Sequence, residues 1–127
     1  MTLNLVFYGG VGTATGANIS LEFNNKKILV DCGILQGAKD AEKRNFDNFK
    51  YDPKDYDFLL VTHAHMDHIG RIPKLVKGGF KGRIISTEET RELAEPMLLD
   101  ALKVMKIKHP KNTMFEIDHI EKTFELW

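Results

Sequence analysis

Residues 58–68 read FLLVTHAHMDH, and this stretch decides both the expected fold and the expected chemistry. Its first four residues, Phe58–Val61, are a short apolar run of the kind that forms a buried strand. Three histidines and an aspartate follow within six residues, namely His63, His65, Asp67 and His68. Neutral imidazoles and carboxylates are natural ligands of zinc and similar divalent ions. The pattern therefore predicts a metal-binding loop directly after a strand.

The spacing of the four side chains divides them into two pairs. His63 and His65 can point to one side together, while Asp67 and His68, past a tight turn, can serve a second ion nearby. Two ions about 3.5–4 Å apart can share a hydroxide that attacks a phosphoryl or carbonyl centre. The alternative is a chance surface cluster of hydrogen-bonded histidines. Three of the chain's five histidines fall in this one window, which favours a two-metal hydrolase site.

The pattern His-x-His-x-Asp-His resembles the signature of the metallo-β-lactamase superfamily. This resemblance implies that His63 and His65 bind a first zinc ion, that Asp67 and His68 bind a second, and that Asp67 also positions the attacking hydroxide. Asp31, at the end of an earlier predicted strand, resembles the superfamily's first motif. It would orient the site from outside the ligand set, as outer carboxylates do. The alternative for Asp31 is a turn residue at the end of a strand.

Two flanking stretches narrow the resemblance. Residues 31–37, DCGILQG, and residues 68–73, HIGRIP, resemble the RNA-processing branch, which includes the β-CASP nucleases and the cleavage-and-polyadenylation-factor-like proteins. The implied activity is hydrolysis of RNA phosphodiester bonds at a two-zinc site, with RNA as the substrate. The alternatives are a small-molecule hydrolase of the same superfamily, acting on thioesters or lactams, and a non-catalytic remnant that binds metal or a partner.

The sequence departs from the family in the number of ligands that it supplies. By resemblance, a further histidine for the first metal, a bridging aspartate and a last histidine come from downstream segments. After His68 only His109 and His119 remain, and both are expected on the surface. We therefore expect residues 1–127 to be the N-terminal part of a metallo-β-lactamase domain, a fragment, split gene product or remnant without the downstream half and the β-CASP insert. Exposed apolar surface would then favour self-association or pairing with the missing half.

The remaining patterns predict a mixed α/β (α+β) fold, the N-terminal half of an αββα sandwich with helices covering a mixed sheet. Strands are expected over 3–8, 19–23, 27–30, 58–61 and 83–85, and helices over 41–46, 69–77, about 88–108 and 118–126. Asn24-Asn25 is the expected hairpin turn between two strands. Ser86 or Thr87 can cap the long helix, with Glu89 completing a capping box after Ser86.

The charge balance argues against a dedicated nucleic-acid-binding module. Lys+Arg and Asp+Glu are both 18, so the formal net charge is zero, and RNA affinity would need a local patch. Five basic residues just past the cluster are the candidates for such a patch: Arg71, Lys74, Lys77, Lys81 and Arg83. They would steer phosphates toward the metals, or they form an ordinary solvated face.

The other signals are weaker. Cys32 is the sole cysteine, which rules out an internal disulfide, favours a cytoplasmic address, and suggests a small buried residue rather than a nucleophile. We expect no secretory signal and no membrane span, because no apolar run approaches about 18 residues.

The glycines at positions 10, 12 and 16 superficially resemble a dinucleotide-binding loop, but a predicted strand follows them instead of a helix. A turn that lets the backbone pass near the metal site is expected there.

Overall fold

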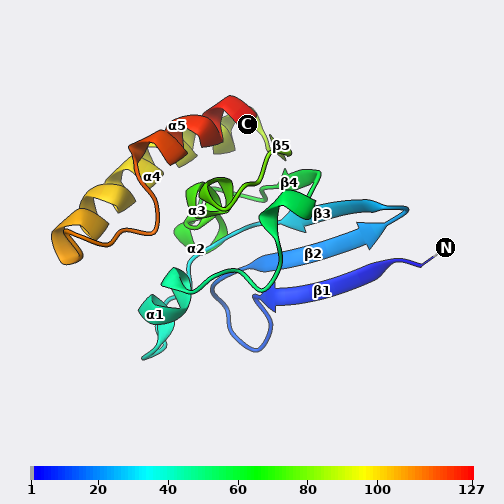
Figure 1. The fold of residues 1–127 in the computed structure, drawn as a ribbon, viewed down its shortest axis with the longest axis horizontal. Helices are drawn as coiled ribbons and strands as arrows, with labels where there is room; N and C mark the ends of the chain where they lie inside the picture. The colour runs from blue at the N-terminus through cyan, green and yellow to red at the C-terminus, as the bar shows by residue number, and fades with distance from the viewer. Residues whose placement is uncertain (1) are drawn as a thin grey trace.

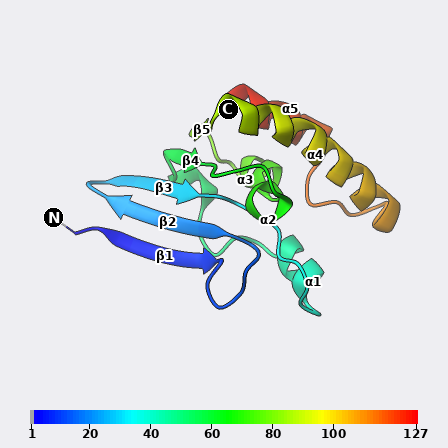
Figure 2. The ribbon, with the colours of Figure 1, turned by 180° about the vertical axis from the view of Figure 1, so that it is seen from behind.

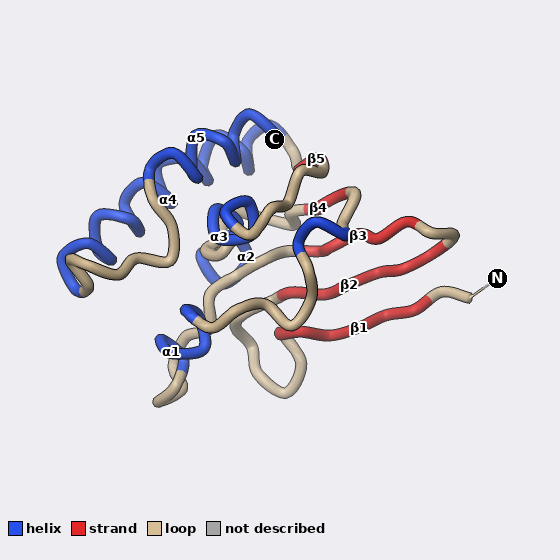
Figure 3. Tube along the Cα trace, in the orientation of Figure 1, coloured by secondary structure: helices blue, strands red, loops and turns tan. Residues whose placement is uncertain are grey.

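The computed structural model describes residues 2–127 and contains one mixed five-stranded sheet, in the order β1-β2-β3-β4-β5 (Figures 1 and 3). The strands are β1 Asn4–Gly9, β2 Asn18–Phe23, β3 Lys26–Val30, β4 Phe58–Leu60 and β5 Arg83–Ile85. The helices are α1 Ala41–Phe46, α2 Met66–Ile69, α3 Ile72–Lys77, α4 Glu88–Lys108 and α5 Ile117–Leu126, with a 3-10 turn at Pro53–Asp55. The predicted mixed α/β architecture is confirmed.

The two halves of the sheet pair in different directions. β1, β2 and β3 are antiparallel, and the hairpin between β2 and β3 turns at Asn24 and Asn25, whose φ angles are 49° and 64°. Asparagine tolerates this left-handed conformation, which a two-residue hairpin turn requires. β3, β4 and β5 are parallel. Since adjacent parallel strands end at the same edge of a sheet, Asp31 after β3 lies beside Thr62 after β4.

The core lies on one face of the sheet, under the helices. Leu29, Leu59 and Ile84 pair in register across β3, β4 and β5, and each is at most 4% exposed. They belong to one apolar cluster with residues of α3, α4 and α5, including Leu98 and Ile120. Figures 1 and 2 both show α4 and α5 side by side near β5, at the far end of the sheet from β1. Burying this face is what anchors β4 and the segment that follows it.

The opposite face of the sheet is apolar but uncovered. Two rows of cross-strand partners run over it, and neither contains a buried residue. Leu5, Phe7 and Ile85 are between 45% and 53% exposed. We call this surface the open sheet face; its members are Leu5, Leu21, Ile28 and Phe58 in one row, and Phe7, Ile19, Val30, Leu60 and Ile85 in the other. Large contiguous apolar surfaces are rare on monomeric soluble proteins.

The helix expected over residues 69–77 is confirmed as α3, but it begins only at Ile72. A separate short helix, α2, precedes it, and Gly70 and Arg71 lie between the two. Pro73 has no N–H to donate to the carbonyl of Ile69, so one continuous helix would lose that hydrogen bond. α2 begins at Met66 and therefore includes two of the proposed metal ligands.

The cap of the long helix is Thr87, not Ser86. Thr87 Oγ1 accepts a hydrogen bond from the Thr90 N–H at 3.3 Å, which is the expected cap geometry. Ser86 Oγ instead accepts from Nε1 of Trp127 at 2.7 Å, so the capping box with Glu89 does not form. Within residues 2–127, no helix is both long enough and apolar enough to cross a membrane.

Candidate metal centre

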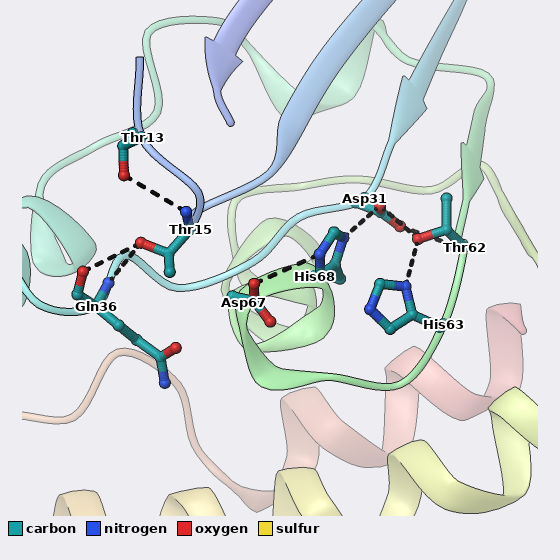
Figure 4. A network of polar contacts seen from close by, with 8 residues as sticks. All are labelled: Thr13, Thr15, Asp31, Gln36, Thr62, His63, Asp67 and His68. Atoms are coloured by element: carbon teal, nitrogen blue, oxygen red, sulfur yellow. Dashed lines mark hydrogen bonds and ion pairs between the residues drawn. The ribbon is translucent and has the colours of Figure 1, made fainter. Parts of the chain in front are cut away.

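The four predicted metal-binding side chains lie together just beyond β4, in the segment that leads into α2. The ring centroid of His63 is 4.7 Å from that of His65 and 4.0 Å from that of His68. Oδ2 of Asp67 lies 3.5 Å from Nε2 of His68. Figure 4 shows the rings of His63 and His68 close to each other, with Asp67 beside His68 on α2. The structure thus places all four side chains at one edge of the sheet.

Asp67 and His68 lie within the short helix α2, not in a loop past a turn as the sequence suggested. Backbone hydrogen bonds from two other segments hold this helix in place. The N–H of Cys32, just after β3, donates to the carbonyl of His68 at 2.9 Å, and the N–H of Ala17 donates to the carbonyl of Asp67 at 3.1 Å. Ala17 ends the glycine-rich loop after β1, so the expected turn beside the site is confirmed.

Gly33 allows the close approach between the segment after β3 and α2. A Cβ at this position would lie 1.7 Å from the carbonyl oxygen of Asp67, which is far closer than two non-bonded atoms can approach. The Gly33 N–H also donates to the carbonyl of Ala17 at 3.0 Å. Gly33 is therefore required for the placement of Asp67, a role that the sequence analysis did not identify.

Asp31 is buried and forms hydrogen bonds with several segments of the chain, so it is not a simple turn residue. Its φ angle is 59°, and it is 3% exposed. The strained backbone is held by the Asp31 N–H, which donates to Leu60 O at 2.8 Å, and by Nδ2 of Asn18, which donates to Asp31 O at 2.9 Å. The carboxylate accepts from the backbone N–H of Thr62 at 2.8 Å, and its Oδ2 lies 2.7 Å from both Thr62 Oγ1 and His68 Nδ1.

Thr62 is a site residue that the sequence analysis missed. Its Oγ1 lies 2.9 Å from Nδ1 of His63, in addition to its contacts with Asp31 (Figure 4). The hydroxyl therefore joins the buried carboxylate to the first histidine of the cluster. The sequence offered no signal for this role beyond the place of Thr62 directly before His63.

The other two histidines lie outside the cluster. His109 Nε2 lies 2.5 Å from Glu42 Oε1, and His119 Nδ1 accepts from the backbone N–H of Glu116 at 2.9 Å within the cap of α5. His119 is less of a surface residue than expected, since its side chain is only 17% exposed. Among the residues that the structure describes, no group of three or more potential ligands surrounds one ion position.

Cys32 is fully buried, as predicted for a small core residue. Burial raises the pKa of its thiol to about 11, although the nearby Arg71 cation acts in the opposite direction. Its burial and its raised pKa both argue against a role as a nucleophile near neutral pH.

Two members of the basic run face inward, which corrects the prediction of one continuous patch. Arg71 is 7% exposed and donates from Nε to the carbonyl of Gly33. Lys74 Nζ donates to the carbonyls of Asn45, at 2.7 Å, and Asp47. Desolvation lowers the pKa of Lys74 to about 8. Lys74 thus holds the segment around α1, and Arg71 holds the segment after β3, against the region of the site.

The other three members of the run, Lys77, Lys81 and Arg83, are exposed. Within this run, these three remain the candidates for contact with phosphates.

Residues 12–127 match the family model of the metallo-beta-lactamase superfamily, and the chain belongs to that superfamily. Ribonuclease TTHA0252 of Thermus thermophilus is 43% identical over 103 residues, which cover 81% of this chain and 23% of the relative. Transcription termination factor FttA of Methanocaldococcus jannaschii is 32% identical over 104 residues, covering 82% of this chain and 16% of the relative. Cleavage and polyadenylation specificity factor subunit 3 of Dictyostelium discoideum is 31% identical over 119 residues, which cover 91% of this chain and 15% of the relative.

These relatives confirm the predicted RNA-processing branch of the superfamily. The chain matches the N-terminal part of these proteins. The chain spans less than a quarter of the length of each of these three relatives. Among solved structures, a metallo-beta-lactamase from Cronobacter sakazakii aligns with a TM-score of 0.46 and 25% identity, over 65% of this chain and 29% of that one.

The donor chemistry of the cluster fits the metal ions that the superfamily's name implies. Nδ1 of His68 is hydrogen-bonded to Asp31 and Nδ1 of His63 to Thr62, which leaves Nε2 of each ring for a ligand. A metal-binding histidine usually has its other ring nitrogen engaged in this way. The number of ligands is too small for a complete site. The cluster supplies two ligands for each ion, whereas a catalytic zinc ion normally has three protein ligands.

Proposed function

We propose that this chain forms the N-terminal half of a two-zinc site that hydrolyses RNA phosphodiester bonds. The observation that carries the proposal is the cluster of His63, His65, Asp67 and His68 at the edge of the sheet, with His68 hydrogen-bonded to the buried Asp31. The names of the relatives, a ribonuclease and a cleavage and polyadenylation factor among them, support RNA over a thioester or lactam.

The proposed roles follow the two pairs. His63 and His65 bind one zinc ion, and Asp67 and His68 bind the other. Bound zinc would polarise the phosphate and lower the pKa of its bound water to about 7. Asp67 orients the attacking water through its carboxylate, and Asp31 holds the ring of His68 from outside the ligand set.

The ligand count argues that the site needs further residues. Two protein ligands per ion fix neither the geometry nor the charge of a site, so we expect weak zinc binding by this chain alone. We also expect no robust nuclease activity from it alone. The remaining ligands would come from a further polypeptide segment that packs beside the cluster.

The open sheet face supports the same view. Its nine apolar residues lie on the side of the sheet away from the helices. Two sheets that pack face to face bury such surfaces between them. We propose that a second sheet, of the kind that completes the superfamily's sandwich, covers the open sheet face. A second copy of this chain is the competing occupant, and measurement of the oligomeric state distinguishes the two.

The proposal can be tested in a chimera in which the matched segment of this chain replaces the corresponding segment of the Thermus ribonuclease. The relative would then supply the other ligands and the covering sheet. We expect zinc-dependent RNA cleavage that is lost in His65→Ala and retained in His109→Ala, a matched control outside the cluster. Turnover of thioesters or lactams without RNA cleavage would favour the small-molecule alternative. A folded chimera without activity toward any of these substrates would favour the non-catalytic one.

A further inference from the structure

Thr62 lies between the buried carboxylate and the first histidine of the cluster. Its Oγ1 is 2.7 Å from Oδ2 of Asp31 and 2.9 Å from Nδ1 of His63. Its backbone N–H donates separately to Oδ1 of Asp31 at 2.8 Å. The backbone therefore fixes Thr62 against Asp31, while the hydroxyl is left to link the Asp31 carboxylate with the ring of His63 (Figure 4).

The direction of the two hydrogen bonds follows from a count of protons. A hydroxyl has one proton to donate, and an ionised carboxylate can only accept. With the carboxylate ionised, Thr62 donates to Asp31, because otherwise two oxygens would face each other at 2.7 Å without a proton between them. A hydrogen bond to a carboxylate is also the stronger of the two. Thr62 Oγ1 then accepts from His63, which places the proton of the neutral ring on Nδ1.

The same carboxylate oxygen acts on His68 directly. Oδ2 of Asp31 lies 2.7 Å from Nδ1 of His68, so this ring also carries its proton on Nδ1. Both rings thereby present the lone pair of Nε2. One oxygen of Asp31 sets the tautomer of one histidine from each proposed ligand pair, directly for His68 and through a hydroxyl for His63.

We infer that Thr62 is a positioning residue that relays the charge of Asp31 to His63 and holds its ring in the Nδ1–H tautomer. The benefit of this relay for metal binding rests on the proposed function, because it requires that Nε2 of His63 is a ligand. The tautomer itself is a property of the chain without metal, and the two claims can therefore be tested separately.

Thr62→Val removes the hydroxyl with little change in shape and keeps the backbone N–H, while Thr62→Ser keeps both. Thr62 is exposed, so neither change should unfold the chain, and circular dichroism checks this. The first measurement is a long-range ¹H–¹⁵N correlation of the metal-free chain at about pH 8, where imidazoles are mostly neutral. We expect His63 as Nδ1–H in the wild type and in Thr62→Ser, with the Nε2–H form appearing in Thr62→Val.

The second measurement is zinc affinity, by competition with a chelating dye. Loss of an outer hydrogen-bond partner typically weakens metal binding about 10–100-fold, so we expect this loss in Thr62→Val and its recovery in Thr62→Ser. An Nε2–H tautomer of His63 in the wild type, or an unchanged tautomer in folded Thr62→Val, would overturn the inference. A tautomer switch in a chain whose histidines do not bind zinc would support the relay and overturn the metal assignment instead.

Discussion

Oδ2 of Asp31 lies 2.7 Å from Nδ1 of His68, although the two residues are 37 positions apart in the chain. Two features of the fold create this contact. The parallel pairing of β3 and β4 brings Asp31 to the edge where the cluster begins, and backbone hydrogen bonds from Ala17 and Cys32 fix α2 beside it. The left-handed backbone of Asp31 then directs a buried carboxylate toward the histidine.

Replacing Asp31 with Asn should weaken zinc binding about 10–100-fold, because the amide keeps the shape but not the charge that holds His68. Asparagine also tolerates a positive φ angle, so the backbone should be preserved. Zinc competition titrations measure the effect. Asp55→Asn, an exposed change outside the cluster, is the control and should leave the affinity unchanged. Equal zinc affinities of Asp31→Asn and the wild type would show that Asp31 does not support the metal site.

Gly33→Ala should destabilise the fold by about 3 kcal/mol, the upper end of the usual cost of overpacking, because the new methyl group would overlap the carbonyl of Asp67. Gly12→Ala is the matched control. Its φ angle of 71° makes alanine unfavourable by about 1–2 kcal/mol, but no atom lies within 4 Å of the new Cβ. Urea denaturation gives both free energies of unfolding. Similar losses in the two variants would mean that α2 is not held through Gly33.

The thiol of Cys32 should resist modification in the native chain at pH 8 and react when the chain is unfolded, since it is buried and its pKa is raised to about 11. The folded state keeps its proton between about pH 9 and 11, where the unfolded thiol loses it. The contribution of the thiol to stability is therefore full below pH 9 and falls as the pH rises through this window.

Urea denaturation at several pH values gives the free energy of unfolding of the wild type and of Cys32→Ala. The difference between the two isolates the pH dependence that the thiol causes from the pH dependence that Lys74 causes. Lys74 acts in the opposite direction, because its pKa is lowered to about 8 in the folded state, and the unfolded chain holds that proton to higher pH. A native thiol that reacts rapidly at pH 8 would contradict the burial of Cys32.

The basic run should divide into two functional groups. Arg71→Ala should destabilise the chain by about 1–3 kcal/mol, because it leaves the carbonyl of Gly33 without its buried donor. Lys77→Ala and Lys81→Ala should leave stability within about 0.5 kcal/mol of the wild type. In the chimera, each of these two lysine variants should reduce the salt dependence of RNA binding by about one phosphate contact. RNA affinity that is insensitive to both lysines would make them an ordinary solvated face.

The regular part of the fold could be predicted from the sequence because its signals are local. Alternating apolar residues indicated β2, the pair Asn24-Asn25 indicated the hairpin, and the apolar run at Phe58 indicated β4. The grouping of the histidines was also local, since their spacing alone brings them to one end of a strand.

The missed features depend on contacts between distant segments. Thr62 acquires its role only when β3 and β4 pair, and Gly33 only when α2 packs against the segment after β3. Arg71 looked like an exposed cation because a sequence does not reveal that Gly33 and Phe49 lie beside it. The start of α3 was signalled by Pro73, which suits the first turn of a helix, but the sequence analysis began this helix at Ile69.

The central claim is that His63 and His68 bind metal through Nε2, with His65 as a further ligand. The most direct test is a zinc titration of the ¹⁵N-labelled chain, followed by long-range ¹H–¹⁵N correlations, which detects even weak binding. His109 and His119 serve as internal controls, because they are held by Glu42 and Glu116 outside the cluster. We predict that the Nε2 signals of His63 and His68 and a ring-nitrogen signal of His65 shift with zinc, while the signals of His109 and His119 stay in place. Five unmoved histidines, or equal shifts at all five, would contradict the account.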